Sequence, residues 1–235
     1  MTMKLSGLLY QRLEQQRRIF SAKRASLFII LYSLLFSFVS VAFSSCAESD
    51  GDEAQNEEFA NWQARNDAFF LSLEDSLKAD PASWQKIKAY TKDENTEGAV
   101  TDYIYAKELS PGDPYEEPPL FSDSVRVCYR GRLIPSDNYP LGYIFDQTYS
   151  GTFNVHTRSV SDGVVSNYVV GFSTALQHMT RDARWLIYIP YALGYGETAS
   201  SVIPAYSTLI FDIELVDYTR DGLPLDSWSS RANAF

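Results

Sequence analysis

The chain contains few of the residues on which metal and thiol chemistry depend. Its 235 residues include two cysteines and two histidines. His156 and His178 stand alone in the sequence, without an HxxE or HExxH spacing around them, and two thiols are too few for a cysteine-ligated metal. We therefore expect both histidines at the surface or on a helix face, no metal site and no cofactor.

Motifs of two further enzyme classes are also missing. The sequence has no GxSxG nucleophile elbow and no GxxxxGK[ST] loop to hold a phosphate. Positive charge is scarce as well. The first 45 residues hold six of the 20 basic residues and one of the 30 acidic ones, so the rest of the chain carries a net charge of −15. Because nucleic acid requires a basic face, we expect no nucleic-acid partner.

Apolar and aromatic side chains, in contrast, are plentiful. They make up 45% and 14% of the chain, which excludes wholesale disorder. The length suffices for one ordinary domain with an appendage. The expected segments, in order, are a signal peptide (1–45), a tether (46–58), a helical arm (59–99), a main domain (100–222) and a tail (223–235).

The N-terminal segment has the features of an export signal. An uncharged apolar run, residues 27–43, follows a basic stretch and precedes Ser44-Ser45-Cys46. This end resembles the lipobox of bacterial lipoproteins, which implies cleavage before Cys46, lipidation of that cysteine and attachment to a membrane. The expected location is the bacterial cell envelope, at the outer membrane, facing the periplasm or the surface. The alternative is an uncleaved anchor that spans the bilayer.

Residues 59–99 are expected to form a helical arm of two helices. The preceding tether is polar and acidic without apolar periodicity, as flexible segments are. The first helix has an apolar stripe with one asparagine, at Phe59, Trp62, Asn66, Phe69, Phe70, Leu73 and Leu77. Asp80-Pro81 ends it and starts a shorter helix with Trp84, Ile87 and Tyr90. The stripe either packs against the main domain or serves as a homodimerisation or client-contacting arm.

The main domain reads as several short strands around one short helix. The helix has apolar residues at helical spacing, namely Phe172, Ala175, Leu176 and Met179. Strands are expected at 102–109, 125–133, 144–146, 151–155, 184–189 and 208–218, with a further strand end at 168–170. Cys128 lies within the second strand, where a small buried residue is expected rather than a reactive thiol. This pattern predicts an α+β fold with an antiparallel sheet.

Several short motifs give this domain a family resemblance. They occur in the order VCYRG around Tyr129, Phe145-Asp146, Phe153, Val169 before Gly171-Phe172, GYG around Tyr195, VIP with Ile203, and TLIFD with Phe211. In this order they resemble the FKBP-type peptidyl-prolyl cis-trans isomerases over residues 100–221, about half of the chain. The resemblance implies an FKBP-like antiparallel sheet wrapped around one short helix.

The resemblance also implies roles for these residues. Asp146 and Tyr195 would act on the substrate amide, as the catalytic pair. The substrate-binding pocket would be lined by Tyr129, Phe145, Phe153, Val169, Phe172, Ile203 and Phe211. Phe172 stands where the best-studied members of the family have tryptophan. An aromatic pocket with one acid and one phenol suits a reaction without group transfer, because rotation about an X–Pro bond makes no covalent bond.

The leading hypothesis is a peptidyl-prolyl isomerase that assists the folding of exported proteins, with proline-containing polypeptides as its clients. A second hypothesis keeps the fold as a chaperone that holds proline peptides with little turnover. A third makes the chain an accessory subunit of a surface assembly. The loops at 134–143 and 154–168 are longer than in minimal family members and could shape the choice of client.

Overall fold

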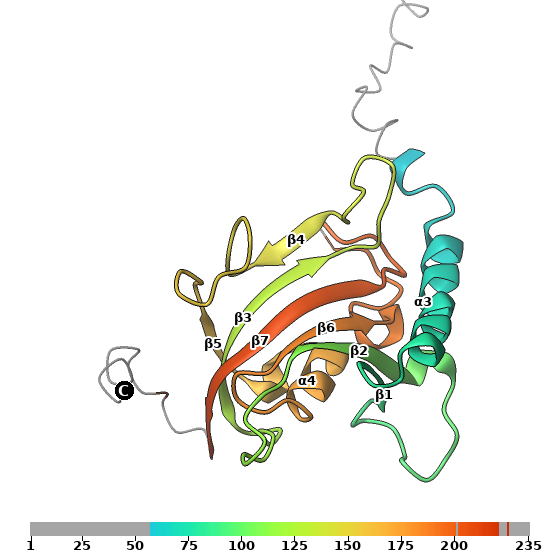
Figure 1. Cartoon of the computed structure of the whole chain (residues 1–235). Helices are drawn as coiled ribbons and strands as arrows, with labels where there is room; N and C mark the ends of the chain where they lie inside the picture. Colours follow the sequence, from blue (N-terminus) through green and yellow to red (C-terminus); the bar gives the residue numbers. More distant parts are fainter. Residues whose placement is uncertain (1–56, 201, 221–224, 226–235) are drawn as a thin grey trace, which may run out of the picture. The chain divides into compact units, whose positions relative to one another are not determined.

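A computed structural model describes residues 57–200, 202–220 and 225 (Figure 1). The expected signal peptide, Cys46, most of the tether and most of the tail lie outside these residues. In the part of the chain that is described, no helix has both the length and the apolar character needed to cross a bilayer.

The core of the fold is a seven-stranded antiparallel sheet (Figure 1). Its strands are β1 Trp84–Lys88, β2 Tyr103–Ser110, β3 Ser124–Arg132, β4 Ile144–Gln147, β5 Ser161–Val164, β6 Arg184–Ile189 and β7 Leu209–Thr219. They lie in the order β1-β2-β6-β7-β3-β4, with β5 beside the other half of β3, and every pairing is antiparallel. The predicted α+β class with an antiparallel sheet is confirmed.

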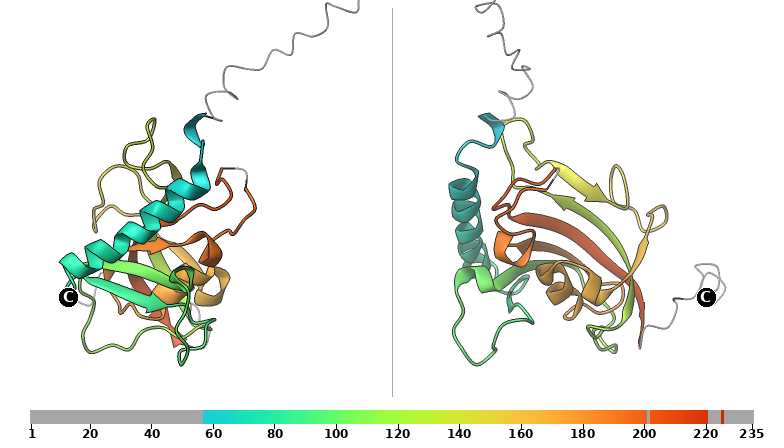
Figure 2. Two further views of the ribbon diagram at one scale, coloured as in Figure 1. Left: turned by 90° about the vertical axis from the view of Figure 1, so that its right-hand side faces the viewer. Right: turned by 180° about the vertical axis from the view of Figure 1, so that it is seen from behind.

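Two α-helices cover opposite faces of this sheet. They are α3 Trp62–Ala79 and α4 Val170–Leu176, and single 3₁₀ turns occur at η1 Val100–Asp102, η2 Val165–Asn167 and η3 Tyr191–Leu193. Successive side chains of β2 point to opposite faces of the sheet. Ile104 packs in the cluster with α4, and Tyr105 packs in the cluster with α3. We call the α4 side the inner face and the opposite side the outer face. Figure 2 shows α3 crossing the β1 and β2 end of the sheet.

Helix α4 lies very close to the sheet because its second residue is glycine. A Cβ atom at Gly171 would stand 2.3 Å from Cγ2 of Ile189 and 3.1 Å from Cγ2 of Ile104. Both isoleucines are fully buried, so neither could yield easily. The close approach lets the predicted stripe, from Phe172 to Met179, bury itself on the inner face.

The apolar stripe of α3 packs on the same domain. Phe70 and Leu73 lie in a cluster with Trp84 and Tyr105, and the Phe70 and Tyr105 rings are 5.2 Å apart. The described residues, from 57 onward, belong to one compact unit. The expectation that this stripe packs against the main domain is therefore confirmed.

Polar contacts at the start of α3 reinforce this packing. The Trp62 indole nitrogen donates a hydrogen bond of 2.8 Å to Ser207 Oγ. The side-chain oxygen of Asn66, which is 1% exposed, accepts a bond of 2.7 Å from the backbone N–H of Thr208. The one polar member of the stripe thus satisfies a buried backbone donor of the segment that leads into β7.

The prediction of a second helix at Trp84 is wrong, because residues 84–88 form strand β1. Trp84 pairs with Lys107 and Ile87 pairs with Ile104. Residues three apart in a strand point to opposite faces, and here both faces are covered. Trp84 packs with Phe70 of α3, whereas Ile87 lies in the inner-face cluster. The three-residue spacing of Trp84 and Ile87 therefore reflects a strand whose two faces are both buried, not one face of a helix.

Three further expectations fail near the loop that follows β4. Residues 151–155 form no strand, whereas β5 lies within the segment expected to be a polar loop. Arg126 holds β5 to β3 through hydrogen bonds of 2.6 and 2.7 Å to Asp162. Residues 168–170 are not a strand end, because they link η2 to α4. The position of this strand depends on long-range pairing with β3, which local propensity does not report.

Candidate functional site

Four aromatic rings meet on the inner face of the sheet. They come from four elements: Tyr129 from β3, Phe145 from β4, Phe172 from α4 and Phe211 from β7. The ring of Phe211 lies 5.1 Å from Phe172, 5.4 Å from Phe145 and 6.0 Å from Tyr129. All three contacts are edge-to-face, the arrangement that aromatic quadrupoles favour. The structure thus brings four of the predicted pocket residues together.

A glycine on β3 makes room for two of these rings. Gly131 pairs with Phe211 across the sheet, and a Cβ atom there would stand 2.6 Å from both the Phe211 and the Phe145 ring. Any side chain at this position would push the two rings apart. The glycine of the VCYRG motif is therefore needed for the site to form.

A carboxylate and a phenol are paired at the edge of this aromatic cluster. The Tyr129 hydroxyl donates a hydrogen bond of 2.7 Å to Asp146 Oδ2. Burial and this bond raise the pKa of Tyr129 well above its usual value, so the phenol stays protonated at neutral pH. Asp146 itself is exposed at the end of β4. The pair offers an oriented carboxylate next to an apolar wall.

Tyr195 lies close enough to interact with this pair. Burial and, secondarily, the charge of Asp146 raise the pKa of the Tyr195 phenol. The residue follows η3 and remains 48% exposed, so its hydroxyl group can reach a bound molecule. The charge of Asp146 therefore influences the Tyr195 phenol, and these are the two residues expected to act on the amide.

The two remaining aliphatic residues of the expected pocket also lie in this region. Ile203, 4% exposed, belongs to the same apolar cluster as Phe172 and Phe211. Val169 packs against that cluster and precedes α4, where its carbonyl group accepts the hydrogen bond from the Ser173 N–H at 3.0 Å. Both therefore belong to the inner-face apolar cluster, and their role in a pocket stays a prediction.

Phe153 is not part of the site. Its ring lies 5.5 Å from Tyr149 and 3.7 Å from the guanidinium carbon of Arg184, in an outer-face cluster with Cys128 and Val216. Arg184 and Cys128 alternate with inner-face residues of their strands, which places this cluster across the sheet from α4. Its assignment to the pocket is wrong, because the loop that carries it folds over the outer face.

Tyr168 is a site residue that the motifs did not identify. Its ring stacks on Phe172 with a centroid distance of 4.6 Å and an interplanar angle of 18°. Burial raises the pKa of the phenol to about 12. The available signal was the presence of two aromatic residues four positions apart around the turn into α4. That signal was obscured because residues 168–170 read as a strand.

The described part of the chain contains no group of three or more His, Cys, Asp or Glu side chains that could hold a metal. Both histidines are exposed, as expected, and Nδ1 of His178 lies 2.8 Å from the Thr174 carbonyl oxygen. Cys128 is 1% exposed, which confirms its expected buried role, and burial raises the pKa of its thiol. The site therefore combines apolar rings with phenols and one carboxylate. Such a set offers apolar surface and hydrogen-bonding groups to a bound molecule.

Comparison with known proteins gives consistent results. A family model for the FKBP-type peptidyl-prolyl cis-trans isomerases matches residues 116–216. The macrophage infectivity potentiator of Trypanosoma cruzi is 36% identical over 106 residues, which cover 44% of this chain and 47% of that protein. An FKBP-type 22 kDa peptidyl-prolyl cis-trans isomerase of Escherichia coli (strain K12) is 34% identical over 100 residues. These residues cover 42% of this chain and 43% of that protein.

Similar proteins are found among solved structures too. A peptidyl-prolyl cis-trans isomerase from Pseudomonas syringae is 25% identical, with a TM-score of 0.43 and coverage of 63% of this chain and 96% of that chain. FkpA from Escherichia coli is 23% identical, with a TM-score of 0.43 and coverage of 80% of this chain and 82% of that chain. The chain spans less than half the length of the two curated relatives named above. The domain that includes residues 116–216 therefore belongs to the FKBP-type peptidyl-prolyl cis-trans isomerase family.

Proposed function

We propose that this chain is a peptidyl-prolyl cis-trans isomerase that acts on proline-containing polypeptides at the site around Tyr129. The observation that carries the proposal is the hydrogen-bonded pair of Tyr129 and Asp146 at the edge of the aromatic cluster. Rotation of an X–Pro bond faces a barrier of roughly 18–20 kcal/mol, which rests on amide resonance. Any group that favours the twisted amide over the planar one lowers this barrier.

The residues of the site divide this task. The aromatic rings exclude water from the substrate, and because water stabilises the planar, dipolar amide, this favours the twisted form. Asp146 is held by Tyr129 and so faces the amide in a fixed orientation. The exposed Tyr195 hydroxyl donates a hydrogen bond to a substrate carbonyl. No proton has to leave the enzyme and no covalent bond is formed.

Removal of either polar group should slow isomerisation more than it weakens binding. Asp146→Ala and Tyr195→Phe should lower kcat/KM for a proline peptide by a few-fold to about a hundredfold, which corresponds to roughly 1–3 kcal/mol. Asp75→Ala, on the exposed side of α3, is the matched control and should leave the rate unchanged. The measurement is a proline-peptide isomerisation assay together with a peptide titration.

A second candidate, a module that holds proline peptides with little turnover, is favoured by one observation. Phe172 and Phe211 are only 2% and 5% exposed, so little of the deep apolar surface is open. The same assay separates the two functions. Wild-type protein that binds proline peptides but never accelerates their isomerisation would replace the enzyme with the holding module. An accessory role in a surface assembly remains a third candidate.

We further propose that the chain is exported and attached to the cell envelope through a lipid on Cys46, where it assists the folding of exported proteins. The basic flank, the apolar run at 27–43 and Ser44-Ser45-Cys46 support this proposal. Mass spectrometry of the detergent-extracted protein should find an acylated Cys46 at the N-terminus. Detection of residues 1–45 on the mature protein would show instead an uncleaved anchor.

A homodimer formed through the arm remains a proposal. The apolar stripe of α3 is used within its own chain, so a dimer would have to form on the other side of the helix, where Leu71 is 55% exposed. A sizing column run with wild type and Leu71→Asp tests it.

A further inference from the structure

The ring that a substrate would need at the bottom of the site is already covered. Phe172 is 2% exposed, although it lies where the family resemblance expects the floor of the pocket. Of the three rings that contact it, those of Tyr129 and Phe211 stand nearly perpendicular to it, at 83° and 90°. Only the Tyr168 ring is nearly parallel, at 18°, and so covers a face of Phe172.

The stacking of Tyr168 on Phe172 takes the place of a contact that a substrate proline ring would make. A proline ring is compact and apolar, and its CH groups pack on the electron-rich face of an aromatic ring rather than on its edge. Tyr168 occupies that position while remaining half-buried, so its outer side faces solvent. The tyrosine ring and a bound proline therefore compete for one face of Phe172.

The attachment of Tyr168 allows its side chain to leave without unfolding the site. Its backbone is extended, with φ −92° and ψ 166°, and lies between η2 and α4. The backbone is held separately, because the Tyr168 carbonyl accepts a bond of 3.2 Å from Ser173 Oγ. The hydroxyl group packs against Gly163, and within the described residues it makes no hydrogen bond that would have to break. Only ring stacking and burial keep the side chain in place.

We propose that Tyr168 is a specificity-determining residue of this site, a cap whose ring must leave Phe172 before a prolyl residue can bind. This inference rests on the proposed isomerase function, because it concerns the same site. The cap lowers the apparent affinity by the fraction of molecules in which Tyr168 is in place. It opposes binding of the planar and the twisted amide equally, so it affects KM and leaves kcat unchanged.

Removal of the ring tests the cap. Tyr168→Ala should bind a short X–Pro peptide about two- to tenfold more tightly than wild type, the fold-change that corresponds to the energy of an aromatic pair. KM should fall by a similar factor at constant kcat. Tyr168→Val is the second variant, since a β-branched residue suits the extended backbone and keeps part of the packing. Peptide titration calorimetry and the isomerisation assay supply the two readouts.

Two control variants distinguish an effect of the Tyr168 ring from a general disturbance of the fold. Tyr168→Phe keeps the ring and removes only the hydroxyl group, so its affinity should equal that of wild type. Tyr218→Ala removes another half-buried tyrosine, one whose hydroxyl bonds the Glu117 carbonyl far along β7, and should not change KM. Melting temperatures establish that each variant is folded.

The outcomes distinguish the cap from the proposed function. Weaker peptide binding by folded Tyr168→Ala or Tyr168→Val would overturn the cap and make Tyr168 a wall of the pocket, while turnover by wild type would still support the isomerase. Tighter binding without turnover in any variant would support the cap and overturn the isomerase. If wild type and every variant failed to bind the peptide, both the cap and the isomerase function would be overturned.

Discussion

Trp62→Ala should lower the free energy of unfolding by about 3–5 kcal/mol, the range for removal of a large buried aromatic side chain. Trp62 is 6% exposed and contacts Phe59 edge-to-face with a centroid distance of 5.0 Å. Its indole N–H bonds Ser207 Oγ, so the variant also loses the anchor between α3 and the segment that precedes β7. The cost therefore includes both a cavity and a lost tertiary bond.

Urea unfolding of the soluble domain measures this effect. Asp75→Ala, on the exposed side of the same helix, is the control and should change stability by no more than about 0.5 kcal/mol. Ser207→Ala removes the hydrogen bond with Trp62 together with the one that Ser207 Oγ donates to the Pro204 carbonyl, and should account for only about 1–3 kcal/mol of the loss. If Trp62→Ala cost no more than Asp75→Ala, α3 would be an appendage that the sheet does not need.

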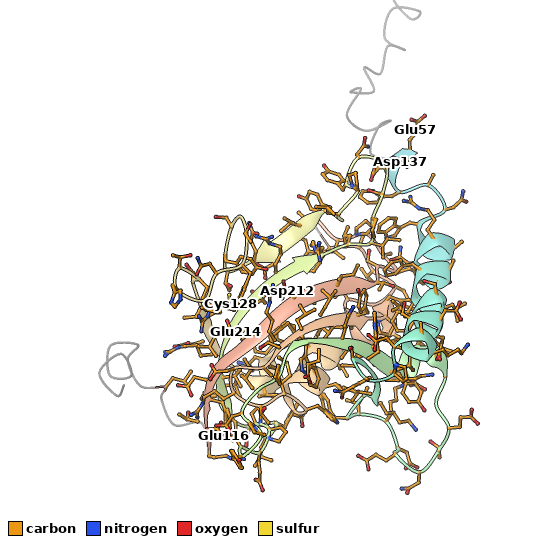
Figure 3. All side chains as sticks on the ribbon, viewed as in Figure 1. Glu57, Glu116, Cys128, Asp137, Asp212 and Glu214 are labelled. Carbon is orange, nitrogen blue, oxygen red and sulfur yellow. The ribbon has the colours of Figure 1, made fainter. Side chains whose placement is uncertain are left out.

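Arg158→Leu should destabilise the fold by about 3–5 kcal/mol at neutral pH, because it leaves a buried carboxylate unpaired. Arg158 Nε lies 2.6 Å from Glu214 Oε2, and the two side chains are 8% and 6% exposed. Figure 3 shows Glu214 near Asp212 and Cys128 over β3 and β7. Burial, together with nearby acids, already raises the pKa of Glu214 above its usual value, against the opposing effect of Arg158.

The pH dependence of this variant has a definite sign. A carboxyl group whose pKa is higher in the folded than in the unfolded state destabilises the fold above that pKa, and the penalty is relieved as pH falls. Without Arg158 the pKa of Glu214 rises further. The loss caused by Arg158→Leu should therefore be smaller near about pH 5 than near about pH 8.

The double variant and a surface pair complete the experiment. Arg158→Leu combined with Glu214→Leu should recover most of the stability, since an apolar pair of suitable size replaces a buried ion pair at little cost. Lys78→Leu removes one partner of an ion pair whose side chains are 73% and 83% exposed, and should cost about 0–1 kcal/mol. A double variant as unstable as the single one would mean that the loop needs Arg158 for contacts other than Glu214.

The strands that face solvent on one side were predictable from local pattern. Residues 184–189 alternate between buried and half-buried side chains, and the next residue, Pro190, cannot continue a paired strand. Both bounds of β6 were therefore predicted correctly. For β3 the alternation of apolar residues with arginines placed the strand within one residue, although residues 125–128 are all buried because Cys128 is covered by Tyr149 on the outer face.

Elements whose environment comes from distant residues were not predictable in this way. Trp84 and Ile87 looked helical because each lies on a different covered face of one strand. Phe153 matched the motif order, yet Tyr149 and Arg184 hold it on the outer face. In both cases the sequence shows that a side chain is apolar, but not which surface it will meet.

For the site, the sequence by itself determined which residues converge. The family's motif order predicted that Tyr129, Phe145, Asp146 and Phe211 meet, and the pairing of β3 with β4 and β7 brings their strands together. Only the tertiary structure decided whether the deepest ring is open. Tyr168 covers Phe172 through the turn of the chain before α4, and such a contact depends on the three-dimensional path of the backbone rather than on residue type.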